Sequence, residues 1–225
     1  MKAKTDKAVS KKKSMVSSSV PSDLEQAANG LLDWIVNAGI NGLGVLAPAE
    51  KVAEDHRRSC KTIEDATNSV IAWNAAYAAG TGFVTGLGGL ATLPIALPAS
   101  LAASYALAAN TIAVIACLRG YDIHSEQVKT MILLSLIGGG AEEILKGAGI
   151  TVGNKVCLNV IKQVPGKVLI EINKKVGFRL ITKAGEKGVI NLTKMVPIAG
   201  GFVSGGFDCL FINTCGHTAK KVFPS

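Results

Sequence analysis

The sequence predicts an all-α protein, a bundle of helices, and three observations lead to this prediction. Apolar residues recur at helical spacing, for example at Val168, Ile172 and Val176. Residues 66–118 form a run of 53 residues without Asp, Glu, Lys or Arg and are rich in Ala and Gly. No stretch shows the regularly spaced turns between short β-branched runs that a sheet protein needs.

The domain organisation is a basic arm followed by one helical domain. A chain of 225 residues has the length of a single domain of ordinary size. Residues 1–20 hold six Lys and one Asp, with many Ser and few large apolar groups. Such a composition cannot offset the entropy of ordering, so we expect residues 1–22 to be disordered and residues 23–225 to form the domain.

The first helices are expected between Pro21 and Tyr77. Pro21 and Asp23 give a helix start, but glycines at 30, 39, 42 and 44 predict only a short helix followed by a Gly-rich turn within residues 24–47. Residues 48–77 have a helical pattern with acids before bases. Thr62 is placed to cap a helix whose third residue is Asp65.

A long apolar helical hairpin is expected from Leu90 to Ile137. Residues 90–118 exceed the roughly 20 residues that span a bilayer, although Ala dominates where Leu and Ile are usual. Ser125 can cap a second helix, from Glu126 to about Leu145, which Gly138 to Gly140 would kink or bring close to a neighbour. The pattern fits both a membrane-inserted hairpin and the centre of a bundle.

Amphipathic helices with basic outer faces follow the hairpin. One is expected around residues 152–160 and another around residues 168–176, where Glu171 is placed to pair with Lys174 and Lys175. In the last apolar segment, 195–215, Gly200, Gly201, Gly205 and Gly206 form a small-x-x-x-small pattern that permits close helix packing.

The sequence lacks the usual signatures of cofactor and metal chemistry. The G-x-G-x-x-A matches at Gly86 and Gly42 follow no predicted strand, so we expect no cofactor. The three His and five Cys are widely spaced, so we expect neither a metal site nor a disulfide framework. The N-terminus has no apolar stretch typical of a secretory signal, which favours a cytoplasmic location.

Positive charge is concentrated in two places, the basic arm and residues 162–194. The second stretch holds seven Lys and one Arg against two Glu, but only Phe178 is available to stack on a base. We therefore expect no nucleic acid partner and assign Lys167, Lys174 and Lys175 to anionic lipid headgroups, although a solvated face fits nearly as well.

Several motifs together resemble the EcsC protein family. They are residues 85–94 (TGLGGLATLP), 118–122 (LRGYD), 141–146 (AEEILK), 176–188 (VGFRLITKAGEKG) and 196–201 (VPIAGG), with Asp208 after them. The likeness runs from about residue 50 to 222, and residues 178–188 are its most specific part.

The resemblance implies a setting rather than a reaction. The family takes its name from an operon that also encodes an ABC transporter, so it implies a membrane and secretion context with an integral membrane transporter as a partner. No catalytic residue follows from it. The polar positions that match the family's motifs are Arg119, Tyr121, Asp122, Glu143, Arg179, Lys183, Glu186, Lys187 and Asp208.

Three hypotheses for the function follow. The first is a non-enzymatic helical protein on the cytoplasmic membrane face, accessory to transport or secretion, in which Arg179 and Asp208 pair inside the apolar interior. The second is a soluble bundle that encloses an acyl chain or another apolar ligand. The third is a hydrolase that uses Lys183, Glu186 or Lys187. The oligomeric state is left open.

Overall fold

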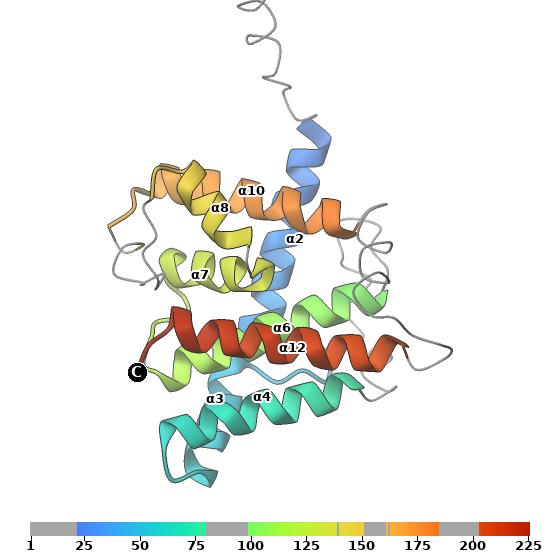
Figure 1. The fold of residues 1–225 in the computed structure, drawn as a ribbon, viewed down its shortest axis with the longest axis vertical. Coiled ribbons are helices and arrows are strands. Elements are labelled where there is room, and N and C mark those ends of the chain that lie inside the picture. Colours follow the sequence, from blue (N-terminus) through green and yellow to red (C-terminus); the bar gives the residue numbers. More distant parts are fainter. Residues whose placement is uncertain (1–21, 80–98, 139, 151–160, 162, 185–202) are drawn as a thin grey trace, which may run out of the picture.

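The structure, a computed structural model, describes residues 22–79, 99–138, 140–150, 161, 163–184 and 203–225. These residues form eight α-helices and no β-strand, so the predicted all-α bundle is confirmed for the part of the chain described (Figure 1). The helices are α2 (Ser22–Asn41), α3 (Ala49–Ser59), α4 (Ile63–Ala79), α6 (Ala99–Leu118), α7 (Glu126–Ile137), α8 (Gly140–Gly147), α10 (Gly166–Ala184) and α12 (Val203–Val222).

Helix α6 is the centre of the bundle. It packs against α2, α3, α4, α7 and α12, and every residue from 102 to 116 is buried. A helix that other helices surround is apolar on all of its faces, because each face packs against protein. Of the described helices, only α6 is long and apolar enough to cross a membrane, and 89% of the residues in its window Leu101–Leu118 are buried within the protein. Length and composition alone do not distinguish a core helix from a membrane span.

Helix α2 is longer than the sequence predicted. It continues through Gly30 and Gly39 to Asn41, and the Gly-rich turn begins only at Gly42, whose φ is +81°. Gly39 faces α6, where a side chain would lie 2.7 Å from the Cβ of Ala109. The Nδ2 of the buried Asn110 donates to the Gly39 carbonyl across 2.9 Å. Packing on α6 therefore outweighs the low helix propensity of glycine, which the local pattern could not reveal.

The capping predictions are confirmed. The Thr62 hydroxyl accepts a hydrogen bond from the Asp65 backbone N–H over 3.0 Å, and the Ser125 hydroxyl accepts one from the Val128 N–H over 3.4 Å. Each side chain satisfies one of the N–H groups that the first turn of a helix leaves without a partner.

The predicted helix from Glu126 to about Leu145 is two helices. Gly138 has a φ of +57°, which ends α7 at Ile137, and α8 begins at Gly140. A left-handed conformation is common for glycine just after a helix and cannot continue it. The hairpin prediction is therefore correct for the chain direction of α6 and α7 but not for the length of the second helix.

The last two helices cover opposite sides of α7. Helix α10 packs on α2, α7 and α8, whereas α12 packs on α4, α6 and α7. Close packing in α12 occurs at Gly216, where a Cβ atom would lie 2.6 Å from Ile71. A Cβ atom added at Gly206 would have no contact within 4 Å among the described residues. Gly200, Gly201 and the helix expected at residues 152–160 lie outside the described residues.

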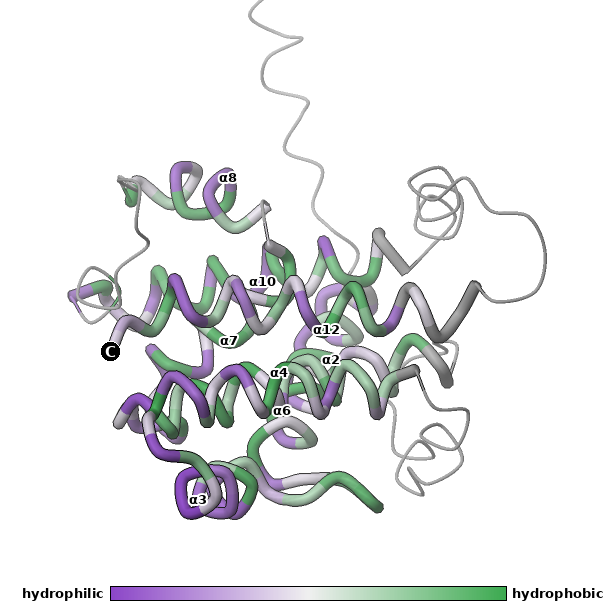
Figure 2. Tube along the Cα trace, turned by 60° about the horizontal axis from the view of Figure 1, so that its bottom comes forward, coloured by the Kyte–Doolittle hydropathy of each residue, from purple (hydrophilic) through white to green (hydrophobic). Residues whose placement is uncertain are grey.

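Charge differs between the two sides of the molecule. Helices α10 and α3–α4 lie on opposite sides of α6 in Figure 1. Helix α10 carries five basic residues and one acidic residue, whereas residues 49–79 carry four basic and five acidic residues. Figure 2 shows that α3 is hydrophilic along most of its length. Helix α10 is therefore the most basic of the described helices, while its neighbours α2 and α8 together carry five acidic residues and one basic residue.

Candidate functional site

The polar residues that match the family's motifs do not form one cluster. Those with described side chains lie in three places: at the C-terminal end of α6, between α8 and α10, and between α6 and α12. Lys183 lies in the last turn of α10, and Glu186 and Lys187 lie outside the described residues. The sequence motifs alone gave no indication of this separation.

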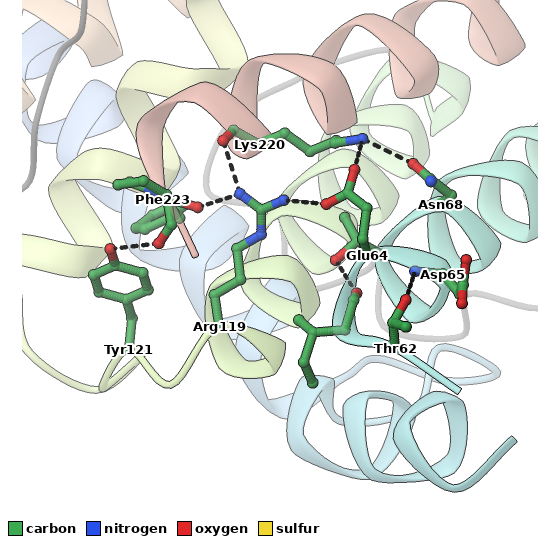
Figure 3. Close-up of polar contacts among 11 residues, drawn as sticks. Thr62, Glu64, Asp65, Asn68, Arg119, Tyr121, Lys220 and Phe223 are labelled. Atoms are coloured by element: carbon green, nitrogen blue, oxygen red, sulfur yellow. Dashed lines mark hydrogen bonds and ion pairs between the residues drawn. The ribbon is translucent and has the colours of Figure 1, made fainter. Parts of the chain in front are cut away.

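Arg119 connects the end of α6 to the C-terminal end of α12 and to the start of α4 (Figure 3). Its side chain is only 4% exposed. One terminal nitrogen, Nη1, donates to the carbonyls of Lys220 at 2.8 Å and Phe223 at 2.5 Å, and the other, Nη2, lies 2.9 Å from Glu64 Oε2. A guanidinium that donates to the last carbonyls of a helix caps it and complements its dipole.

Glu64 forms ion pairs with two basic side chains, Arg119 and Lys220. Lys220 forms an ion pair with its other carboxylate oxygen, and the same ammonium donates to Asn68 Oδ1 over 2.9 Å. The hydrogen bond and charge of Lys220, together with the charge of Arg119, lower the pKa of Glu64, while partial burial opposes them. The carboxylate is thus held ionised between two bases, which is a structural arrangement rather than that of a proton donor.

Tyr121 and Asp122 extend this contact along the loop after α6. The Tyr121 hydroxyl donates to the Pro224 carbonyl over 2.9 Å, and its ring lies 5.2 Å from that of Phe223. The Asp122 carboxylate accepts a hydrogen bond from the His124 N–H over 2.9 Å and so orders the turn before α7. Arg119 and Tyr121 together fix residues 220–224 against the bundle.

Arg179 pairs with Glu143, not with Asp208 as the sequence suggested. The Arg179 Nη1 lies 2.8 Å from Glu143 Oε2. The guanidinium lies over Gly140, where a side chain would be only 2.5 Å from the Arg179 Cζ. The glycine run therefore permits a close contact between α8 and α10. Glu142 pairs instead with Lys146 over 2.7 Å, four residues along α8.

Asp208 lies half-buried on α12 and faces α6. Its Oδ1 accepts a hydrogen bond from the Ser104 hydroxyl over 2.6 Å. Burial raises the pKa of this carboxyl, and the Ser104 hydrogen bond opposes the shift. The pairing of Arg179 with Asp208 was wrong because the two residues lie on α10 and α12, which do not pack against each other.

The lysines assigned to lipid headgroups all lie exposed on α10. Lys167, Lys174 and Lys175 lie on the outer side of the helix together with Phe178, which is 42% exposed. We call these four residues the α10 outer face. Lys174 pairs with Glu25 of α2 over 2.5 Å rather than with Glu171, and the Lys175 ammonium lies 3.4 Å from the Gly147 carbonyl.

A cleft of about 510 Å³ lies between α2, α7 and α10, and sequence analysis did not predict it. The described residues contain no group of three His, Cys, Asp or Glu side chains suited to a metal ion, in the cleft or elsewhere. The sequence contained one signal for the cleft: α2 has a polar residue at every fourth position, at Asn29, Asp33, Asn37 and Asn41. The lining residues are Asn29, Leu32, Asp33, Val36, Asn37, Ile40, Asn41, His124, Glu126, Lys129, Leu133, Ile170 and Asn173.

Comparison with known proteins gives one match. The model of the EcsC protein family matches residues 1–224. The chain belongs to the EcsC protein family. The match includes residues 1–49, which the resemblance of the motifs had left outside. No curated protein and no solved structure matches this EcsC protein.

Proposed function

We propose that this EcsC protein is a non-enzymatic, peripheral membrane protein that binds anionic lipid headgroups on the cytoplasmic face through the α10 outer face. The observation that carries the proposal is that three lysines and an aromatic ring, Phe178, are all exposed on one helix. The apolar side of α10 is buried in the bundle, at Leu169, Ile172 and Val176. Its exposed lysines would therefore lie at the lipid phosphates, with Phe178 as the apolar contact.

The energies favour attachment by several lysines together. Each basic residue near an anionic lipid surface contributes about 1 kcal/mol. The ion pair between Lys174 and Glu25 costs little to break when Lys174 binds lipid, because both side chains are more than 40% exposed and exposed ion pairs are weak. Lys167, Lys174 and Lys175 thus remain available to an anionic surface.

The charge distribution gives the molecule one preferred orientation. Residues 49–79, on the opposite side of α6, have more acidic than basic residues. Residues 1–20, with six Lys, precede α2, whose first turns contact α10 through Glu25 and Lys174. An anionic membrane would therefore attract α10 more strongly than α3 and α4.

The contacts of α6 favour peripheral attachment over insertion of the hairpin. The Asn110 side chain donates to the carbonyls of Gly39 and Ala47, and the Asn74 amide donates to the Thr111 hydroxyl over 2.9 Å. Transfer of α6 to lipid would break these buried hydrogen bonds and expose the amides to hydrocarbon, which costs several kcal/mol.

The other hypotheses receive less support. An acyl chain requires an apolar cavity, whereas the cleft is lined by amides and charged groups along with its apolar residues. Of the residues considered for a hydrolase, Glu186 and Lys187 lie outside the described part of the chain. A role as an accessory to transport or secretion, with an integral membrane transporter as partner, remains part of the proposal through the family's context.

Vesicle flotation of the full chain tests the proposal. Wild type is compared with the triple variant Lys167→Gln, Lys174→Gln and Lys175→Gln, using phosphatidylcholine vesicles with and without phosphatidylserine. We expect wild type to float only with the anionic vesicles and high salt to release it. The triple variant should bind at least about tenfold more weakly.

A matched triple variant controls for net charge. Lys51, Lys61 and Lys221 are exposed on other parts of the surface, and their replacement by Gln removes the same charge. This variant should keep most of the binding. Equal losses in both triple variants, or equal flotation of wild type with neutral vesicles, would contradict the proposal.

A further inference from the structure

We propose that the cleft between α2, α7 and α10 binds an extended peptide segment of a partner protein, a function beyond attachment to lipid. Its volume of about 510 Å³ lies within the usual range of ligand sites, about 300–1,000 Å³. One wall is a row of four polar side chains on α2, namely Asn29, Asp33, Asn37 and Asn41, which we call the α2 polar row. All four are exposed.

The spacing of the α2 polar row matches the repeat of an extended chain. Residues four apart on a helix rise about 6 Å along its axis. Because the row also winds around the helix, the steps between side-chain ends are slightly longer than this rise. In a β-strand, the N–H and C=O groups of alternate residues point to the same edge. These residues repeat about every 6.4–6.8 Å. Successive members of the row turn by about 40° around the helix, so two or three neighbouring members can meet one edge of an extended peptide.

The chemistry of the row also suits a peptide backbone. An asparagine amide has a donor and an acceptor, as a peptide group has. Asn41 Nδ2 donates to Asn37 Oδ1 over 2.7 Å, so the Asn37 N–H groups and the Asn41 oxygen are the groups that a peptide would meet there. Asn173 supplies a further amide from α10, on the other side of the cleft. Its Oδ1 is buried and has no hydrogen-bond partner among the described residues, so a rotation that brings this oxygen to a peptide N–H would be favourable.

The remaining lining predicts which side chains the peptide carries. Leu32, Ile40 and Leu133 are buried and form an apolar floor, onto which alternate side chains of an extended peptide would point. Asp33 and Glu126 add two exposed carboxylates, and Lys129 pairs with Glu126 over 2.9 Å, so Asp33 supplies the net negative charge of the lining. We infer a segment of alternating apolar and basic residues.

The length of the segment follows from the row. From Asn29 to Asn41 the helix rises about 18 Å, which an extended chain covers in about five or six residues. Such a segment is short enough to come from a loop or a terminus of a partner. Main-chain hydrogen bonds would supply affinity and the floor would supply selectivity.

Fluorescence anisotropy with a labelled hexapeptide of alternating leucine and lysine tests the inference in the absence of lipid. The chain has a net charge of +8, so general attraction of a cationic peptide is disfavoured. We expect saturable binding, and we expect the same peptide with N-methyl groups on alternate residues along one edge to bind at least about tenfold more weakly.

The protein variants give a second, independent readout. The double variant Asn37→Ala and Asn173→Ala should bind the parent peptide at least about tenfold more weakly. Asn213→Ala, which changes an exposed asparagine of α12, should bind it as wild type does. Absence of saturable binding, equal binding of the methylated peptide or unchanged binding by the double variant would overturn the inference. Vesicle flotation of the double variant should be unchanged, so failure here leaves the membrane proposal standing.

Discussion

At the scale of single residues, most polar side chains in the family's motifs stabilise the fold. Arg119 caps the C-terminal end of α12 and pairs with Glu64, and Arg179 joins α10 to α8 through Glu143. Neither role is visible in the sequence, because 101 positions separate Arg119 from Lys220 and 36 separate Arg179 from Glu143. Helix caps such as Thr62 were predictable because donor and acceptor lie three residues apart.

The lowered pKa of Glu64 predicts how stability depends on pH. Its stabilising contribution is present above the unfolded-state pKa of a glutamate, about 4.3, and is lost as the pH falls through the lower folded-state pKa. Asp208, whose pKa is raised, contributes in the opposite sense: its contribution is present at low pH and is lost as the pH rises.

We therefore expect Glu64→Gln to reduce the free energy of unfolding at pH 7, with a difference from wild type that shrinks as the pH falls below about 4.3. Urea denaturation at a series of pH values measures this. Glu171→Gln, at an exposed position of α10, serves as a control that should show a smaller difference at pH 7. A difference between wild type and Glu64→Gln that stays constant down to pH 3 or so would contradict the assigned ion pairs.

At the scale of helices, glycine has two roles that the sequence does not separate. Gly138 ends α7 through its backbone conformation, and Gly39 permits α2 to approach α6. The sequence predicted a short helix and a Gly-rich turn in residues 24–47, because helix propensity is a local property and packing is not. The existence of helices was predictable from apolar spacing, but which glycines interrupt them depended on tertiary contacts.

Replacement of Gly39 by Ala distinguishes these two roles. Ala favours a helix by about 1 kcal/mol, but its methyl group would lie 2.7 Å from the Ala109 Cβ and 2.9 Å from the Ala109 backbone carbon. Overpacking costs about 1–3 kcal/mol, so after the gain in helix propensity we expect a net loss of up to about 2 kcal/mol in the free energy of unfolding. Urea denaturation measures it.

Gly206→Ala is the matched control, since Gly206 lies in α12 with no atom within 4 Å of the position of a methyl group. We expect a gain of up to about 1 kcal/mol there. If both substitutions stabilised the protein equally, α2 and α6 would not meet as described.

At the scale of the whole molecule, α6 fills the centre and α10, the most basic of the described helices, lies at the surface. The sequence predicted the all-α fold, the apolar helix and the basic helix, because each follows from composition and periodicity. It left open whether α6 faces lipid or protein, and it did not predict the cleft, which forms only where α2, α7 and α10 meet. Exposed aromatic side chains occur on both sides, at Phe178 of α10 and at Trp73 of α4.

Phe178 and Trp73 allow the proposed orientation of the protein on a membrane to be tested. Flotation with anionic vesicles is measured for Phe178→Ser and, separately, for Trp73→Ser, whose side chain is 67% exposed on the opposite side of α6. We expect several-fold weaker binding for Phe178→Ser and unchanged binding for Trp73→Ser, because only the α10 outer face would meet the lipid. Weaker binding of Trp73→Ser with unchanged binding of Phe178→Ser would contradict this orientation and place the membrane on the α4 side.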